Sequence, residues 1–198
     1  MDNTGKLFVI ACIFSFLYIW TNKITSTLFS MITKATLEDI PALTTLINSA
    51  YRGETSKKGW TTEAHLLEGK RTDDPEMTEI LLDAKNTILK YTENNQIIGS
   101  VLLVEKEHQL YLGMLTVSPE LQNSGIGKKM LTEAENHAKA LGLSSIIMTV
   151  ISVREELIAW YKRHGYVDTG EREAFPESEI HVTISDEPLE FVFMEKRL

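Results

Sequence analysis

The amino-acid sequence predicts one mixed α/β domain in which helices flank a single central sheet. Three observations support this prediction. Consecutive strand-like segments precede a long amphipathic helix, which argues against a purely alternating, doubly wound fold. Strand and helix then alternate, and two strand-like segments close the chain. The 198 residues suffice for one domain and contain no repeat or interdomain linker, so we expect the domain to occupy residues 31–198.

The first half of this domain is expected to begin with a short strand at residues 32–35. Thr36-Leu-Glu-Asp39 resembles a capping box, which predicts that a helix begins at Thr36. A short helix is expected at residues 62–68, and another from Asp74 with Ala84 facing inward. The helix after Thr36 is supported by an apolar stripe at helical spacing, which consists of Ile40, Leu43, Leu46, Ile47 and Ala50.

The second half of the domain begins where the hydrophobic period changes. Residues 86–93 and 96–106 are rich in β-forming residues and flank Asn94-Asn95, which predicts a hairpin with a tight turn. The remaining elements are expected, in order, as a strand at 109–117, a helix at 125–141, a strand at 144–151, a helix running from a capping box at Ser152-Val-Arg-Glu155 to His164, and closing strands near 166–175 and 189–196.

Composition and charge exclude several classes of protein. The net charge of −8 and the pI of about 5.2 argue against a nucleic-acid binder and are mildly compatible with cationic amine substrates. Cys12 is the sole cysteine, so no disulfide or thiolate metal site forms within one chain. The five histidines are scattered without metal-ligand spacing, so we expect no metal. A reducing, cytoplasmic setting is the simplest expectation.

The N-terminal segment, residues 1–30, carries an apolar run at 7–20 that is interrupted by Ser15 alone. As a helix this run would be about 21 Å long, which is short of the roughly 30 Å hydrocarbon core of a bilayer. A signal-peptide region, a membrane anchor of marginal length and an extension translated from an upstream start all remain open. We expect membrane contact only through this run, with a membrane-associated protein as the alternative to a cytoplasmic one.

A glycine-bearing loop, Gln122 to Gly127, joins a strand that ends at Val117 to the long helix. At such a junction several backbone amides lack a carbonyl partner, and the helix dipole adds partial positive charge, so a phosphate is a suitable ligand. Gly125 and Gly127 have no Cβ, which lets an anion approach the main chain. A plain connection with glycines for the turn is the alternative. A Walker loop is excluded because Gln122 replaces its first glycine.

Two motifs in this order resemble those of the GNAT acetyltransferases. The run Gln122-x-x-Gly125-x-Gly127 follows Leu115-Thr-Val117 and resembles the acetyl-CoA-binding motif. Val150 and Trp160-Tyr161-x-x-x-Gly165-Tyr166 resemble the next strand and helix of the family. The resemblance covers about residues 31–198. It implies a mostly antiparallel sheet with splayed middle strands, and an N-acetyltransferase that moves an acetyl group from acetyl-CoA to a primary amine by direct attack in a ternary complex.

The resemblance also implies roles for particular residues. Tyr161 matches the general acid of the family, while a helix aromatic packed into the core is the alternative. Arg154 stands where many members carry Asn, and could meet a phosphate, a substrate carboxylate or solvent. The positions that match the cofactor-binding residues are Leu115, Thr116, Val117, Gln122, Asn123, Ser124, Gly125, Ile126, Gly127 and Lys128.

The acceptor is expected to be a small-molecule or peptide amine of unknown identity, bound by a monomer or homodimer. In this fold the region that matches residues 51–73 often covers the acceptor, so Trp60 and Glu63 are candidate substrate-binding residues, and Phe175 could form another wall. A surface loop anchored by Trp60 is the alternative. We assign no general base. The runner-up function is a noncatalytic acyl-CoA-binding sensor module, against which the presence of Tyr161 argues.

Overall fold

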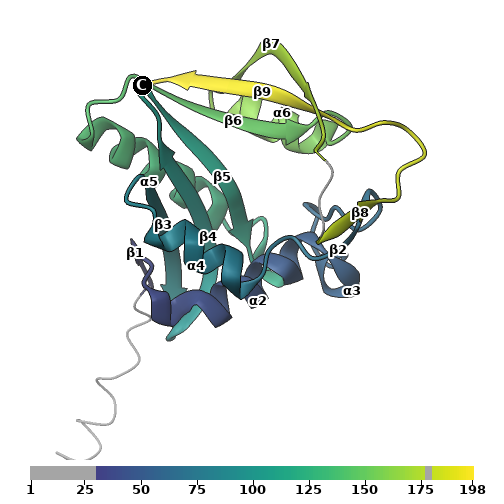
Figure 1. Ribbon diagram of the computed structural model, residues 1–198. Helices are drawn as coiled ribbons and strands as arrows, with labels where there is room; N and C mark the ends of the chain where they lie inside the picture. The colour runs from purple at the N-terminus through teal and green to yellow at the C-terminus, as the bar shows by residue number, and fades with distance from the viewer. Residues whose placement is uncertain (1–29, 177–179) are drawn as a thin grey trace, which may run out of the picture.

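A seven-stranded sheet forms the centre of the computed structural model, which describes residues 30–176 and 180–198 (Figure 1). The strand order is β1-β3-β4-β5-β6-β9-β7. Every neighbouring pair is antiparallel except β5 and β6, which are parallel. The predicted mixed α/β fold with a mostly antiparallel sheet is therefore confirmed.

The elements of the described chain begin with β1 (Ser30–Lys34), η1 (Leu37–Asp39), α2 (Ile40–Tyr51), α3 (Gly53–Ser56), β2 (Leu67–Gly69) and α4 (Asp74–Leu82). The central part holds β3 (Asn86–Glu93), β4 (Gln96–Glu105), β5 (Gln109–Val117), η2 (Pro119–Leu121) and α5 (Ile126–Ala140). The chain continues with β6 (Ser145–Ile151), α6 (Glu155–Arg163), β7 (Val167–Ala174), β8 (His181–Thr183) and β9 (Glu190–Arg197).

Local sequence signals account for several of these boundaries. The predicted hairpin is confirmed, and both Asn94 and Asn95 have positive φ, 50° and 61°, as its tight turn requires. Asp39 accepts a hydrogen bond from the Thr36 amide at 2.8 Å, as a capping box predicts. The regular helix nevertheless begins at Ile40, because residues 37–39 first form a 3-10 turn.

Three local predictions were wrong. Residues 62–68 form no helix: the amide of Leu67 donates to the carbonyl of Glu63, which completes one helical turn, and Leu67 then joins β2. Pairing of β2 with the distant β8 outweighs the local helical preference. Ser152 does not cap α6, whose N-cap is Arg154. Ala84 lies beyond the end of α4 and is exposed.

Helices cover both faces of the sheet. On one face α2 and α4 bury Ile40, Leu43, Ile47 and Met77 against the strands. On the other face α5 packs through Met130, Leu131, Ala134 and Ala138, and α6 adds Tyr161. Figure 1 shows α2 and α4 crossing in front of β3 and β4, with α5 behind the sheet. The sheet between these two helical layers opens between β5 and β6.

The middle strands diverge after a short parallel contact. β5 and β6 pair only over Gln109–Tyr111 and Ser145–Ile147. The register between β4 and β5 also shifts opposite Val101, where β5 holds one extra residue and Met114 adopts a positive φ of 46°. Such a bulge bends a strand and strengthens its twist. The bend carries the end of β5 away from β6 and exposes an unpaired strand edge to the space between them.

The apolar run at 7–20 lies outside the described residues, as does nearly all of the segment 1–30. Membrane contact through this run and a cytoplasmic setting for the protein therefore stay predictions. Within residues 30–176 and 180–198, none of the helices has both the length and the apolar character needed to cross a bilayer.

Leu43→Ala should destabilise the fold by about 2–5 kcal/mol, because Leu43 is fully buried and its truncation leaves a cavity. Leu82→Ala is the matched control, since Leu82 is 68% exposed and should change the free energy of unfolding by less than about 0.5 kcal/mol. Urea denaturation of both variants checks this. Equal effects would contradict the assignment of α2 to the core.

Candidate functional site

A cavity of about 220 Å³, here called the strand cavity, lies where β5 and β6 diverge. Apolar side chains of both strands form one wall. Charged and aromatic side chains from elsewhere in the chain complete it, among them Tyr51, Arg52, Glu63, Arg71, Arg154, Tyr161, Phe175 and His181. The cavity therefore gathers segments that are up to 140 residues apart in sequence around the open edge of the sheet.

A second cavity of about 300 Å³, here called the loop cavity, lies beside the start of α5. Its wall includes the strand end at Leu115 and Val117, most of the loop 121–128, and the indoles of Trp60 and Trp160, whose ring centroids are 6.3 Å apart. The two cavities have five lining residues in common, which are Tyr51, Leu115, Arg154, Leu157 and Tyr161. A molecule that lies in the loop cavity can thus meet a second molecule in the strand cavity at these side chains.

The loop at the start of α5 presents free backbone donors. Among the described residues, the amides from Asn123 to Lys128 have no hydrogen-bond acceptor, and the first helical bond runs from Lys129 to Gly125 at 3.1 Å. Asn123 and Gly125 have φ values of 66° and 86°, in the left-handed region. At Gly125 an added Cβ would meet no atom within 4 Å, so the glycine serves the backbone conformation. The loop therefore combines free amides with the positive end of a helix, two features that favour an anion.

Gln122 holds this loop against the segment that follows α3. Its side-chain amide accepts a hydrogen bond from the Trp60 amide at 2.8 Å and donates to the Thr61 hydroxyl at 2.8 Å. A Cβ at Gly59 would lie only 2.6 Å from Gln122 Oε1, so Gly59 provides the space for this contact. Gln122 thus lines the loop cavity while its polar atoms bind protein.

Tyr161 of α6 lies at the junction of the cavities. Its side chain is buried, and its ring packs edge-on against Trp160 and Tyr166 at centroid distances of 5.0 and 5.7 Å. Its hydroxyl has no hydrogen-bond partner in the described part of the chain. Burial, followed by the nearby Tyr51, raises the pKa of Tyr161 well above the ordinary phenol value. The phenol is therefore protonated near neutral pH and can donate a proton into the junction.

Tyr51, at the end of α2, also faces both cavities and was missed by the sequence analysis. Its hydroxyl donates to the Leu115 carbonyl at 2.8 Å, on the open edge of β5. Burial, followed by the Glu63 carboxylate, raises the pKa of Tyr51. Nothing in the local sequence separates this tyrosine from one that ends an amphipathic helix.

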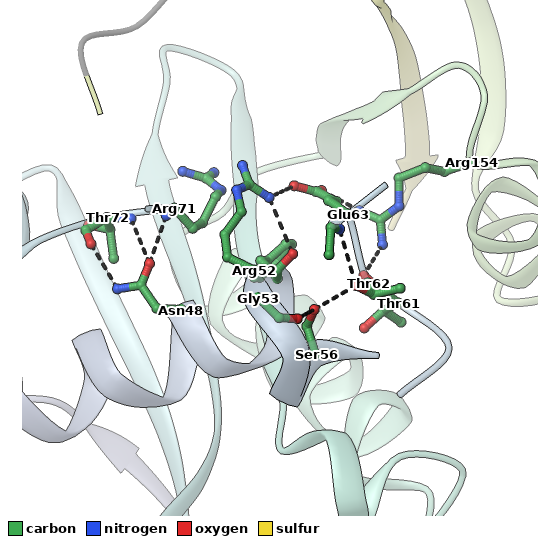
Figure 2. A network of polar contacts seen from close by, with 12 residues as sticks. Asn48, Arg52, Gly53, Ser56, Thr61, Thr62, Glu63, Arg71, Thr72 and Arg154 are labelled. Carbon is green, nitrogen blue, oxygen red and sulfur yellow. Dashed lines mark hydrogen bonds and ion pairs between the residues drawn. The ribbon is translucent and has the colours of Figure 1, made fainter. Parts of the chain in front are cut away.

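A buried cluster of three charges joins three segments at the wall of the strand cavity (Figure 2). The Glu63 carboxylate accepts hydrogen bonds from Arg52 through one oxygen and from Arg154 through the other. Arg154 also donates to the Thr61 carbonyl at 2.6 Å. Their side chains are 5%, 7% and 9% exposed for Arg52, Glu63 and Arg154, respectively, so these charges are largely removed from water. Arg154 is therefore not a solvated first-turn side chain.

The sequence of the chain matches a known protein family. The model of the acetyltransferase (GNAT) family matches residues 43–166, which is more than half of the chain. The chain belongs to the GNAT family of acetyltransferases. No curated protein sequence matches this GNAT chain at a significant level.

Solved structures of acetyltransferases share the fold of this GNAT protein. The ribosomal-protein-S18-alanine N-acetyltransferase of Escherichia coli is 13% identical with a TM-score of 0.64, covering 85% of this chain and 94% of its own. The ribosomal-protein-alanine N-acetyltransferase of Brucella melitensis is 18% identical with a TM-score of 0.64, at 85% and 98% coverage. The PaiA N-acetyltransferase of Thermoplasma acidophilum, solved with coenzyme A, is 18% identical with a TM-score of 0.60, at 86% and 99% coverage.

The structure of this GNAT protein distributes the predicted site residues unequally. Thr116 and Ser124 line neither cavity, because the Thr116 hydroxyl bonds the Met114 carbonyl and the Ser124 hydroxyl bonds the Leu121 carbonyl. Glu63 and Phe175 line the strand cavity, whereas Trp60 lines the loop cavity instead. The other predicted cofactor-binding residues all line the loop cavity, namely Leu115, Val117, Gln122, Asn123, Gly125, Ile126, Gly127 and Lys128.

Side chains that could bind a metal are dispersed in the described part of this GNAT protein. Across residues 30–176 and 180–198, His, Cys, Asp and Glu form no group of three or more that could hold a metal ion. The expectation that the protein uses no metal stays a prediction.

Glu63→Gln should lower the free energy of unfolding by about 3–5 kcal/mol, because it leaves two buried guanidinium groups without their shared counter-charge. Glu54→Gln is the matched control, since the Glu54 side chain is 87% exposed and pairs only with a neighbouring lysine. Its stability should stay close to that of the unmodified protein. Urea denaturation of both variants tests the cluster, and equal midpoints would show that Glu63 does not hold it together.

Proposed function

We propose that this GNAT protein transfers an acetyl group from acetyl-CoA to a primary amine by direct attack within a ternary complex. The observation that carries the proposal is the set of free amides at the start of α5, which lie beside a cavity that meets a second cavity at Tyr161. One anionic substrate and one acceptor can thus approach each other from two sides of a single residue.

The residues of the loop cavity fit acetyl-CoA as the acyl donor. The amides of residues 123–128 can donate hydrogen bonds to the oxygens of a diphosphate, and Lys128 adds positive charge. The unpaired edge of β5 presents backbone groups at Leu115 and Val117 to the amides of a pantetheine arm, as an added strand would. This placement directs the thioester end toward the junction of the two cavities.

Tyr161 is assigned as the general acid of the transfer. The amine nitrogen forms a bond to the acetyl carbon, the carbon–sulfur bond breaks, and Tyr161 donates its proton to the departing thiolate. Burial raises the pKa of Tyr161 and keeps the phenol protonated at neutral pH, and a thiolate that forms in the same buried junction becomes more basic for the same reason. No side chain is assigned as the base, so the newly acylated nitrogen releases its extra proton to water, and Tyr161 regains a proton from water after the thiol departs.

The first test follows free thiol release from acetyl-CoA across a panel of primary amines. We expect turnover with at least one amine, and we expect CoA to shift the amide resonances of residues 123–128. Tight CoA binding without turnover of any amine would favour a noncatalytic acyl-CoA sensor. Unmoved amide resonances at this loop would overturn the proposed donor site.

Tyr161→Phe should lower kcat by about 10²- to 10⁴-fold, which is the usual contribution of a general acid, while the affinity for CoA stays unchanged. Tyr166→Phe is the matched control, because Tyr166 is equally buried, lines neither cavity and has no partner for its hydroxyl among the described residues. Steady-state kinetics and calorimetry of both variants check this. Unchanged turnover in Tyr161→Phe would remove Tyr161 from the mechanism.

A further inference from the structure

The wall of the strand cavity carries an excess of positive charge. Three arginines, Arg52, Arg71 and Arg154, line it, and Glu63 is the sole carboxylate of the described residues that does so. The whole chain, in contrast, has a net charge of −8. A concentration of cations in one small cavity of an acidic protein needs a local explanation, because isolated charges are costly to remove from water.

Some guanidinium donors of this cluster have no acceptor even though Glu63 binds two of the arginines. Arg154 uses both of its terminal nitrogens, one on Glu63 and the other on the Thr61 carbonyl. Arg52 donates to Glu63 and, weakly, to the Tyr51 carbonyl at 3.4 Å, and both bonds come from the same nitrogen, Nη1. Its Nε is buried and has no partner, although the side chain is only 5% exposed. An unsatisfied donor on a buried guanidinium indicates a missing acceptor.

Arg71 brings a second available guanidinium to the same wall. Across residues 30–176 and 180–198 it forms no ion pair, and its guanidinium carbon lies 5.7 Å from the centre of the Tyr51 ring. Arg71 lines the strand cavity together with Arg52 (Figure 2). His181 lines the cavity as well, and its buried Nε2 has no partner. Burial, and then the charges of Arg52 and Arg71, lower the pKa of His181, which agrees with both arginines lying close to it.

We propose that the acceptor is a small amine that also carries an anionic group, a carboxylate or a phosphate, and that Arg52 and Arg71 bind this group in the strand cavity. The proposal rests on the proposed acetyl transfer and names the class of its acceptor. A planar guanidinium offers paired donors that match the oxygens of either anion. The same wall disfavours polyamines, whose second ammonium would meet three arginines and a single carboxylate.

The experiment compares pairs of amines with and without the anionic group, and each kcat/KM is divided by the fraction of free amine, because the anionic group also changes the pKa of the amine. Glycine is compared with glycinamide, L-phenylalanine with L-phenylalaninamide, and O-phosphoethanolamine with ethanolamine, each under saturating acetyl-CoA. We expect kcat/KM to be about 10- to 100-fold higher for the anionic member of a pair, which is the range for hydrogen bonds to a charged group. The first two pairs test a carboxylate and the third tests a phosphate. Equal values in every pair, or a preference for the neutral amines, would overturn the proposal.

Variants locate the preference on the cavity wall. Arg71→Gln should lower the ratio of kcat/KM between the anionic and the neutral amine of a pair by about tenfold, because it removes one of the two guanidinium groups that bind the anion. Arg172→Gln is the matched control: Arg172 is exposed on β7, pairs with Asp168 and lines neither cavity, so the preference should persist. A preference that survives Arg71→Gln would contradict the assignment. Arg52→Gln is less suitable, because Arg52 also neutralises buried Glu63.

A binding measurement separates this inference from the proposed function. N-acetylglycine and N-acetyl-L-phenylalanine, and their amides, are titrated into the complex of the protein with CoA by calorimetry, while NMR follows the Nε–H resonances of Arg52 and Arg71. We expect binding of the acids about tenfold tighter than that of the amides, with both resonances shifted. If no amine is acetylated yet this preference holds, the proposed function fails and the anion site stands. If amines are acetylated but acids and amides bind equally, the anion site fails alone.

Discussion

The divergence of β5 from β6 is the constraint on which both cavities depend. Two neighbouring parallel strands would normally pair along their full length, but here the pairing ends at Tyr111 and Ile147. The bulge at Met114 supplies the bend, at the cost of a left-handed backbone on a residue with a Cβ. Such strain persists only where the surroundings hold it, and β4 pairs with β5 on both sides of the bulge. The sheet thus buries its core and still leaves one strand edge open.

Two polar contacts connect the segment after α2 with the rest of the site. Gln122 binds residues 60 and 61 from the loop before α5, and Arg154 at the start of α6 binds Glu63 and the Thr61 carbonyl. A buried ion pair is weak evidence for added stability, since desolvation offsets much of the attraction. Its directional hydrogen bonds do fix relative positions. The cluster therefore explains how a segment with little regular structure holds a defined wall over both cavities.

The sequence predicted the parts of the site that local chemistry determines. Gly125 and Gly127 before an amphipathic helix indicated free amides, and Asn94-Asn95 indicated the hairpin turn. The helix predicted at residues 62–68 is limited to a single turn, because strand pairing with residues 181–183 ends it. Local sequence patterns also do not predict that Arg52, Arg71 and His181 line one cavity. This arrangement depends on β8 lying beside β2, a contact between segments more than 100 residues apart.

The net charge of the chain does not predict the charge of the strand cavity. An acidic chain is mildly compatible with a cationic substrate, yet most of its carboxylates are exposed, where water and salt screen them beyond about 10 Å. Arg52 and Arg154 of the strand cavity are largely removed from water, and a charge that enters the cavity meets them at short range and low effective dielectric. The few charges on the wall therefore outweigh the many on the surface. The preference of a cavity follows from which of its own donors and acceptors remain unsatisfied, and here these include the buried Nε of Arg52, beside an Arg71 that forms no ion pair in the described part of the chain.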